Sequence, residues 1–357
     1  MYFMLGIKMF RCIMWKIIYI CGTLKLKTST MKLKQILLAC VIVFFSCNKD
    51  KNNTANVENV TGFKEKMREF VVRISQYSKA IKPNFLIVPQ NGIELVTQNG
   101  EDTGQPHTAY INAIDANGQE DLFYGYDNDD QATPSSNTNY LKTFLNVSKN
   151  AGKTILVTDY CSTNSKITDS YLKNTTNGYI SFAANHRQLD NVPAFPNPIN
   201  NENNAVVNNL SQVKNLLYLI NPTNFATKTE FITAVTSSNY DLLIMDLFFK
   251  DGTEFSSTEI SQLKNKANGG KRLIISYMSI GEAENYRYYW QNNWNTTKPT
   301  WLDAENPNWA GNYKVKYWNT EWQNIIYGND NSYLKKVVNA NFDGVYLDII
   351  DAFEYYE

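Results

Sequence analysis

Acidic residues stand inside or directly after apolar stretches of this sequence, which makes them candidates for acid–base chemistry. Asp348 lies within Val-Tyr-Leu-Asp-Ile-Ile, and Asp246 lies within Leu-Leu-Ile-Met-Asp-Leu. A charge inside an apolar strand costs free energy unless it is paired or functional. Glu282 and Glu284 follow a Ser-Ile-Gly stretch, whose glycine lets the backbone turn. We predict that these four carboxylates are catalytic.

Each of these acids also has a structural interpretation. Asp348 could cap the loop after its strand, and either glutamate could pair with Arg287. The chain contains only two histidines, His107 and His186, which argues against histidine-based catalysis. A set rich in carboxylates and poor in histidine suits glycosidic cleavage, which needs one protonated carboxyl and one ionised carboxyl.

Aromatic and polar side chains near these acids are candidates for substrate binding. The sequence contains 23 Tyr, 18 Phe and 7 Trp, and rings of this kind stack on sugar faces as well as filling cores. The substrate-binding candidates, with packing inside the protein as the alternative for each, are Tyr277, Arg287, Tyr288, Trp301, Tyr317, Trp318, Gln90, Asn91, Glu120, Asp121, Asp159, Tyr160 and Asp351.

Short apolar runs separated by polar or helical stretches are expected to position these residues. Continuous Ile, Leu and Val runs indicate strands buried on both faces, as a parallel sheet requires. The expected strands are 85–89, 121–125, 154–160, 178–184, 215–221, 241–247, 272–279 and 344–350. Helices are expected from 63, over 140–149, over 257–268 behind a capping box, and over 333–340.

This alternation predicts the α/β class and a (β/α)₈ barrel. A doubly wound open sheet is the alternative, but no glycine-rich phosphate loop follows any of the strands. The globular part begins with a helix that no strand precedes and ends on strand 344–350, which no helix follows. In a closed barrel such ends are neighbours. We therefore expect 344–350 beside 85–89 and 178–184 beside 215–221, with carboxylates 159, 246, 282 and 348 at one mouth.

Several multi-residue motifs resemble the family 114 glycoside hydrolases, the endo-α-1,4-polygalactosaminidase-like barrels. One set matches the first half of that family and lies at 277–287, 301–302, 311–318 and 344–351. The other set matches the second half and lies at 89–92, 120–124 and 158–161. In ordinary members the second set follows the first, whereas here it precedes it. The resemblance therefore implies a circularly permuted TIM barrel.

The resemblance further implies hydrolysis of an amino-sugar polysaccharide by paired carboxylates, without a metal or cofactor. Reactive groups in such a barrel lie at the C-terminal ends of the strands. In the better-characterised branch a glutamate two residues before the strand-four aspartate is implicated in catalysis, and Tyr346 occupies that place here. The acid and nucleophile roles therefore cannot be transferred. A surface glycan-binding lipoprotein that has lost turnover is the alternative function.

The N-terminal segment has the layout of a secretory signal. A basic stretch from Met31 precedes the apolar run 35–45 and then Ser46-Cys47, which resembles a lipoprotein signal with Cys47 lipidated. Residues 1–30 read as an over-extended gene start or a genuine leader. We expect residues 48–61 to be a flexible tether and 62–357 to be one barrel. Within it, 62–189 is the second family half, 190–212 a connector and 213–357 the first half.

The charge balance of the exported part bears on its partners. Residues 1–46 hold seven Lys and Arg and no Asp or Glu, so 27 basic residues remain against 34 acidic ones. This excess of acid disfavours nucleic acid and favours a cationic ligand. Cys161 is then the only cysteine besides Cys47, which excludes an internal disulfide framework. We expect a monomer in the cell envelope, lipid-anchored to the outer membrane and facing the periplasm or the surface.

The signal interpretation makes a direct prediction. Cys47→Ala should move the protein from the membrane fraction to a soluble fraction, because a single lipidated residue supplies the anchor. Fractionation of cells expressing the wild type and the variant measures this. Equal membrane retention of both proteins would contradict the assignment of Cys47.

Overall fold

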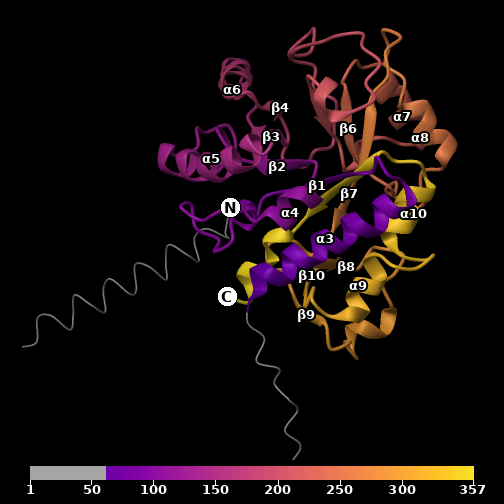
Figure 1. Ribbon diagram of the computed structural model, residues 1–357. Coiled ribbons are helices and arrows are strands. Elements are labelled where there is room, and N and C mark those ends of the chain that lie inside the picture. Colours follow the sequence, from indigo (N-terminus) through magenta and orange to yellow (C-terminus); the bar gives the residue numbers. More distant parts are fainter. Residues whose placement is uncertain (1–61) are drawn as a thin grey trace, which may run out of the picture. The chain divides into compact units, whose positions relative to one another are not determined.

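Parallel strands dominate the part of the chain that the computed structural model describes, residues 62–357 (Figure 1). A five-stranded sheet has the order β1-β11-β7-β6-β5, and a three-stranded sheet has the order β2-β3-β4. The strands are β1 (Leu86–Pro89), β2 (Ala116–Glu120), β3 (Thr154–Tyr160), β4 (Ile180–Ala184), β5 (Leu216–Tyr218), β6 (Leu242–Asp246), β7 (Leu273–Ser279) and β11 (Gly344–Asp348). The predicted α/β class with parallel sheet is confirmed.

The two parallel sheets meet at two places. A parallel bridge between Gln90 and Gly118 links β1 to β2, and Asn91 N donates to Gly118 O at 3.0 Å. At the other end β4 and β5 lie in contact, as predicted, but no ladder joins them. The C-terminal strand β11 pairs in parallel with β1, with Leu86 opposite Gly344, so this predicted neighbour relation is confirmed.

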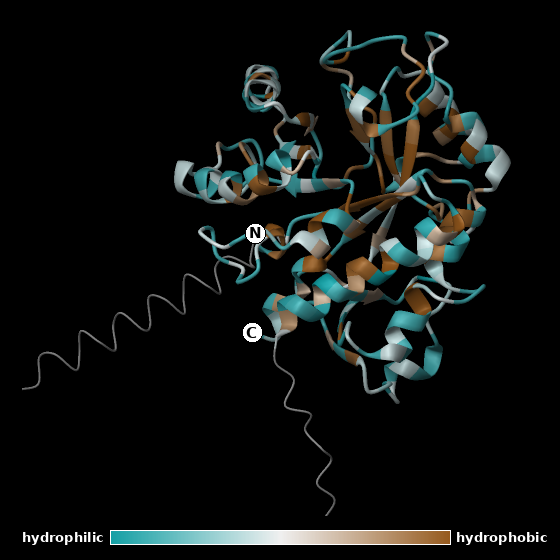
Figure 2. Cartoon of the chain, in the orientation of Figure 1, coloured by the Kyte–Doolittle hydropathy of each residue, from teal (hydrophilic) through white to brown (hydrophobic). Residues whose placement is uncertain are grey.

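Helices alternate with the strands and cover them. They are α3 (Phe63–Ile81), α4 (Thr108–Ala113), α5 (Ser135–Asn150), α6 (Asn164–Asn177), α7 (Lys228–Thr236), α8 (Ser257–Leu263), α9 (Thr320–Ile326) and α10 (Tyr333–Asn339). Helix α3 buries one apolar stripe that includes Met67, Phe70 and Ile74, while its other face is polar. Figure 2 shows this division, with hydrophobic strands inside and helices that are polar on one side. No helix among these residues is long and apolar enough to cross a membrane.

A small antiparallel sheet follows β7 and carries part of the site. Its order is β8-β10-β9, with β8 (Glu282–Glu284), β9 (Leu302–Glu305) and β10 (Asn312–Val315). Trp322 anchors this region because its indole N–H donates to Ile280 O at 2.8 Å and its ring packs on Trp301. The antiparallel sheet therefore holds the chain after β7 close to the strand ends.

The strand predicted at 121–125 is wrong, because the strand is β2 at Ala116–Glu120. Its sequence, Ala-Asn-Gly-Gln-Glu, has no apolar run although its first four residues are buried. An added Cβ at Gly118 would overlap the hydroxyl of Tyr346, so the tyrosine ring fills the space that an apolar side chain of β2 would otherwise fill. Asp121 has a φ of 58°, which ends the extended backbone there.

Other boundaries differ less. The capping box of Ser256 and Glu259 is confirmed, but helix α8 ends at Leu263 instead of 268. The stretch 190–212 contains one short 3₁₀ turn, Leu210–Gln212. It is held by the buried Lys266, whose ammonium contacts Asp241 and the Asn203 carbonyl. The predicted signal, Cys47 and the tether lie outside the described residues.

The contact between Gly118 and Tyr346 predicts a stability effect. Gly118→Ala should lower the free energy of unfolding by about 1–3 kcal/mol, because the new methyl group overlaps a buried ring. Adding Tyr346→Phe should recover part of this loss, since it removes the nearest atom. That hydroxyl has no hydrogen-bond partner within the described residues, so Tyr346→Phe alone should cost little. Urea denaturation of all three variants measures the coupling, and additive effects would contradict it.

Candidate functional site

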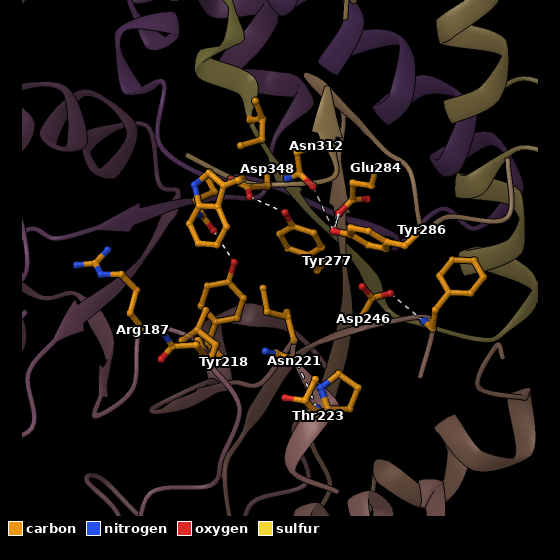
Figure 3. A pocket seen from close by; sticks show the side chains of 18 of the residues that line it. Arg187, Tyr218, Asn221, Thr223, Asp246, Tyr277, Glu284, Tyr286, Asn312 and Asp348 are labelled. Carbon is orange, nitrogen blue, oxygen red and sulfur yellow. Dashed lines mark hydrogen bonds between the residues drawn. The ribbon is translucent and has the colours of Figure 1, made fainter. Parts of the chain in front are cut away.

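A cavity of about 570 Å³ opens at the C-terminal ends of the parallel strands (Figure 3). Each parallel strand contributes a residue from its C-terminal half or from the loop that follows it. The polar residues that line the cavity include Gln90, Asn91, Glu120, Tyr160, Arg187, Tyr218, Asn221, Asp246, Tyr277, Glu284, Arg287, Asn312, Asp348 and Asp351. The cavity lies where the chemistry of such folds is concentrated.

Asp348 ends β11 and contacts Tyr277 of the neighbouring strand β7. The Tyr277 hydroxyl donates to Asp348 Oδ2 at 2.7 Å (Figure 3). Burial, followed by the nearby Glu120 carboxylate, raises the pKa of Asp348 to about 7. At neutral pH a large fraction of this carboxyl therefore carries a proton that it can donate.

Glu120 ends β2 and accepts hydrogen bonds from neutral donors. Gln90 Nε2 and the Tyr160 hydroxyl each donate to one of its oxygens, and Asn91 Nδ2 donates at 3.1 Å. Gln90 is oriented in turn by the Tyr218 hydroxyl, which donates to Gln90 Oε1 at 2.8 Å. The Glu120 carboxylate is thus fixed at the cavity wall by hydrogen bonds and not by an ion pair.

Arg287 binds two other carboxylates of the cavity at once. Its Nε and Nη2 donate to the two oxygens of Glu284 at 2.6 and 3.1 Å. Its Nη1 lies 2.9 Å from Asp246 Oδ1, and its Nη2 lies 2.7 Å from Asp246 Oδ2. Burial raises the pKa of Asp246, and Arg287 opposes that rise. The Tyr286 hydroxyl also donates to Glu284 Oε1, at 2.6 Å.

Aromatic and cationic groups form the rim of the cavity. The side chains of Tyr286 and Trp309 are each 60% exposed, so flat apolar faces border the opening. Arg187, from the loop after β4, also lines the cavity. Its guanidinium lies 3.8 Å from the Tyr160 ring centroid and donates to Asp121 and Asp129. Such rings and hydrogen-bonding groups together suit a carbohydrate.

Most of the residues predicted for the site line this one cavity. They are Asp348, Asp246, Glu284, Tyr277, Arg287, Gln90, Asn91, Glu120, Tyr160 and Asp351. They come together from positions 90 to 351 because the C-terminal ends of parallel strands meet at one edge.

The expectation that carboxylates 159, 246, 282 and 348 share one mouth is wrong for Asp159 and Glu282, which lie outside the cavity lining. Asp159 is fully buried and accepts from the backbone N–H groups of Phe123 and Tyr124, and also from Ser170 and Asn174. Glu282 is also fully buried. One of its oxygens accepts from Asn306 and Tyr355. Asp159 holds the loop after β2, and Glu282 holds the chain after β7.

Four predicted aromatic residues and Asp121 also lie outside the cavity lining. Trp301 and Tyr317 are buried in the core, and Tyr317 donates to Phe63 O. The remaining three are held elsewhere: Trp318 packs on Tyr356, Tyr288 donates to Asn331 O, and Asp121 pairs with Arg187. Burial raises the pKa of Asp121 to about 7, against the effect of Arg187.

The sequence-based list missed several lining residues, namely Arg187, Tyr218, Asn221, Tyr286, Trp309 and Asn312. Asn221 ends the predicted strand 215–221 and Arg187 follows the predicted strand 178–184, so strand-end position did indicate both, although neither was chosen for the site. Tyr218 lies within the apolar run 215–221 and could not be told from a core residue. Trp309 and Asn312 lie in or beside a β-hairpin that no apolar pattern marks. Within residues 62–357 no cluster of His, Cys, Asp and Glu is arranged to hold a metal ion.

A protein-family model matches part of this chain. Residues 218–356 match the model of glycoside-hydrolase family GH114. The matched segment contains Asp246, Tyr277, Glu284, Arg287 and Asp348, whereas Gln90, Asn91, Glu120 and Tyr160 precede it.

Three uncharacterized proteins are similar to parts of the chain. One from Methanocaldococcus jannaschii is 41% identical over 50% of this chain and 49% of its own length. Those from Thermotoga maritima and Deinococcus radiodurans are 41% and 40% identical, each over 34% of this chain and 36% and 37% of their own lengths. The chain thus spans about half or less of each. The structure of Aspergillus fumigatus Ega3 with galactosamine covers 39% of this chain and 43% of its own, at 22% identity. Its TM-score of 0.25 supports no conclusion.

The double ion pair of Arg287 predicts a large stability effect. Arg287→Met should lower the free energy of unfolding by about 3–5 kcal/mol, because two buried carboxylates lose their partner. The Asp246 carboxyl, with its pKa then raised further, keeps a proton in the folded state that it loses on unfolding. The deficit should therefore grow as pH rises. Arg73→Met, at an exposed helix position, is the control. Denaturation of both variants at pH 5 and pH 8 measures the loss. A loss for Arg287→Met no larger than that for Arg73→Met would contradict the role of Arg287.

Proposed function

We propose that this protein is a glycoside hydrolase that cleaves an amino-sugar polysaccharide, in the manner of an endo-α-1,4-polygalactosaminidase. One observation carries the proposal: Asp348 lines the cavity, and burial, followed by the nearby carboxylate of Glu120, raises its pKa to about 7. The match of residues 218–356 to GH114 supports the same reaction class.

Asp348 is the general acid in this proposal. Its carboxyl accepts from the Tyr277 hydroxyl and from the backbone N–H of Ile349, and the proton that it carries passes to the glycosidic oxygen. Protonation of that oxygen makes it a better leaving group as the bond to the anomeric carbon breaks. An ionised carboxylate on the other side of the sugar ring then assists the incoming water or bonds to the carbon.

The charge of the cavity supports an amine-bearing substrate. Of the three cations within residues 62–357 that line the cavity, Arg187 and Arg287 are each bound to carboxylates, and the exposed Lys250 donates to Thr223 O. Within the described chain no Lys or Arg lies within ion-pair distance of Glu120, Asp348 or Asp351. Protonated amines on a polymer can therefore interact with acids that have no cation of their own, while the exposed Trp309 stacks on a ring face.

We propose further that the parallel strands close into a circularly permuted (β/α)₈ barrel. The bridge between Gln90 and Gly118 supports closure at one junction, and the contact of β4 with β5 supports it at the other. The pairing of β11 with β1 and the position of the GH114 match in the C-terminal part support the permuted order. We also propose that the enzyme acts in the cell envelope through a lipid on Cys47.

A glycan-binding protein without turnover is the second candidate. It is favoured by the ion pairs that occupy Asp246 and Glu284, and by Tyr346, whose buried ring lies two residues before Asp348. New reducing ends released from polygalactosamine or another glycan separate the two functions, because a binding protein releases none.

Asp348→Asn should abolish the release of reducing ends, because the amide keeps the shape but donates no acidic proton. For the wild type, kcat/KM should fall as pH rises through about 7, where Asp348 loses its proton in the free enzyme. At acidic pH, where Asp348 carries its proton, the free energy of unfolding of the variant should stay within about 1–2 kcal/mol of that of the wild type.

The stability of the two proteins should also diverge with pH in a known direction. The pKa of Asp348 is raised in the folded state, so its contribution to stability is full at low pH and is lost as pH rises toward 7. The asparagine variant lacks this dependence and should gain stability relative to the wild type over that range. Full activity of Asp348→Asn, or its failure to fold, would overturn the assignment.

A further inference from the structure

We propose that Glu120 is the catalytic carboxylate that acts with Asp348, and that Asp246 and Glu284 serve to hold Arg287. This inference rests on the proposed function and names its second reacting group. Glu120 ends β2 and lies outside the segment 218–356 that matches GH114. The reacting pair would then join two distant parts of the chain.

The alternation of side chains along the strands places Glu120 opposite Asp348. Tyr346 and Asp348 are two residues apart on β11 and point to the same face, as do Gly118 and Glu120 on β2. The Tyr346 hydroxyl lies against Gly118. One layer further toward the C-terminal ends, the same geometry brings residue 348 toward residue 120.

Strand β1 lies between the two acids and ties their strands together. Gln90 N donates to Leu347 O on β11 at 2.8 Å, and Asn91 N donates to Gly118 O on β2 at 3.0 Å. The side chains of the same two residues donate to the Glu120 carboxylate. Asn91 Oδ1 also accepts from the backbone N–H of Glu120 at 3.0 Å. Glu120 is therefore held from several directions by groups that carry no charge.

Asp246 and Glu284 are in a different situation. Each presents both of its oxygens to Arg287, and Glu284 also accepts from Tyr286. Both oxygens of each carboxylate are therefore engaged by a guanidinium that carries a full positive charge, which suits them to positioning Arg287. Glu120 is bound by neutral donors instead, and its carboxylate is one of the groups that raise the pKa of Asp348.

The reaction balances with these two groups and one water. Asp348 gives its proton to the glycosidic oxygen as the C1–O bond breaks. Glu120 either accepts a proton from the water that attacks C1, or bonds to C1 and is displaced by water whose proton Asp348 takes. In each case one glycosidic bond and one water become two hydroxyl groups. In the nucleophile route Asp348 recovers its proton from the water, whereas in the base route Glu120 ends protonated and Asp348 ionised, and proton exchange with solvent resets both.

The test uses the full chain with soluble polygalactosamine and other amino-sugar polymers. Glu120→Gln and Glu120→Ala should each lower kcat by about 100-fold or more while the melting temperature is retained. Sodium azide should restore turnover of Glu120→Ala and yield a glycosyl azide, because the small anion replaces the missing carboxylate. In either role the azide attacks C1 from the face opposite the leaving group and gives a product of inverted configuration. The anomeric configuration of the wild-type hydrolysis product, retained if Glu120 is the nucleophile and inverted if it is the base, distinguishes the two roles.

Matched variants separate a reacting group from a positioning group. Glu101→Gln, at an exposed position outside the cavity, should keep wild-type activity. Asp246→Asn and Glu284→Gln should lose activity without azide rescue. Removal of the Glu120 charge should also shift the alkaline limb of the residual activity to lower pH, because Asp348 then loses its proton more easily.

The outcomes distinguish this inference from the function on which it rests. If the wild type releases reducing ends and Glu120→Gln keeps more than a third of its kcat, the inference is wrong and the function stands. Inactive Glu120 variants with no azide rescue and an unshifted alkaline limb would also overturn it. If the folded wild type cleaves none of the polymers, the proposed function fails and takes the inference with it.

Discussion

The contact between the Tyr346 ring and Gly118 is the steric constraint on which the site depends. It brings β11 and β2 close on either side of β1. A larger residue at 118 would push Tyr346 away and, with it, Asp348 two residues further along the strand. The tyrosine hydroxyl has no hydrogen-bond partner within the described residues, and burial raises its pKa well above the usual value. It contributes shape here instead of polarity.

The cavity divides its carboxylates into two chemical kinds. Asp246 and Glu284 share one guanidinium, and cation–π contacts of Arg287 with Phe248, Tyr286 and Tyr333 hold that group in place. Glu120 and Asp348 contact tyrosine and amide donors instead. Removing the charge of Asp246 or Glu284 leaves the buried Arg287 without one of its partners. Removing the charge of Glu120 or Asp348 leaves only uncharged donors beside the substituted side chain. Both kinds lie within one cavity but serve different ends.

The sequence predicted correctly those strands that bury their own apolar side chains. The ladders of β11 with β1 and of β6 with β7 follow runs of Ile, Leu and Val, and Asp348 and Asp246 stand out against those runs. Strand β2 was not predicted, because the ring of Tyr346 from β11 fills the space beside Gly118 that an apolar side chain of β2 would otherwise fill. Trp301, Tyr317 and Asp159 were wrongly predicted to lie in the site. The sequence near a strand end does not show whether an aromatic or acidic side chain faces the cavity or the core. That distinction depends on neighbours distant in sequence.

The missing ladder between β4 and β5 has a mechanical consequence. Strands β4 and β5 are the end strands of the sheets β2-β3-β4 and β1-β11-β7-β6-β5, each at the end away from the junction of β1 with β2. Asn221 N donates to Leu189 O at 3.2 Å where the loops after them meet, and both residues line the cavity. Widening at this joint breaks few backbone hydrogen bonds. Widening beside β1 would break the β1–β11 ladder on one side, or the Gln90–Gly118 bridge and the hydrogen bonds of Gln90 and Asn91 to Glu120 on the other. The cavity rim is therefore easier to widen between β4 and β5 than at the strands that carry Asp348 and Glu120.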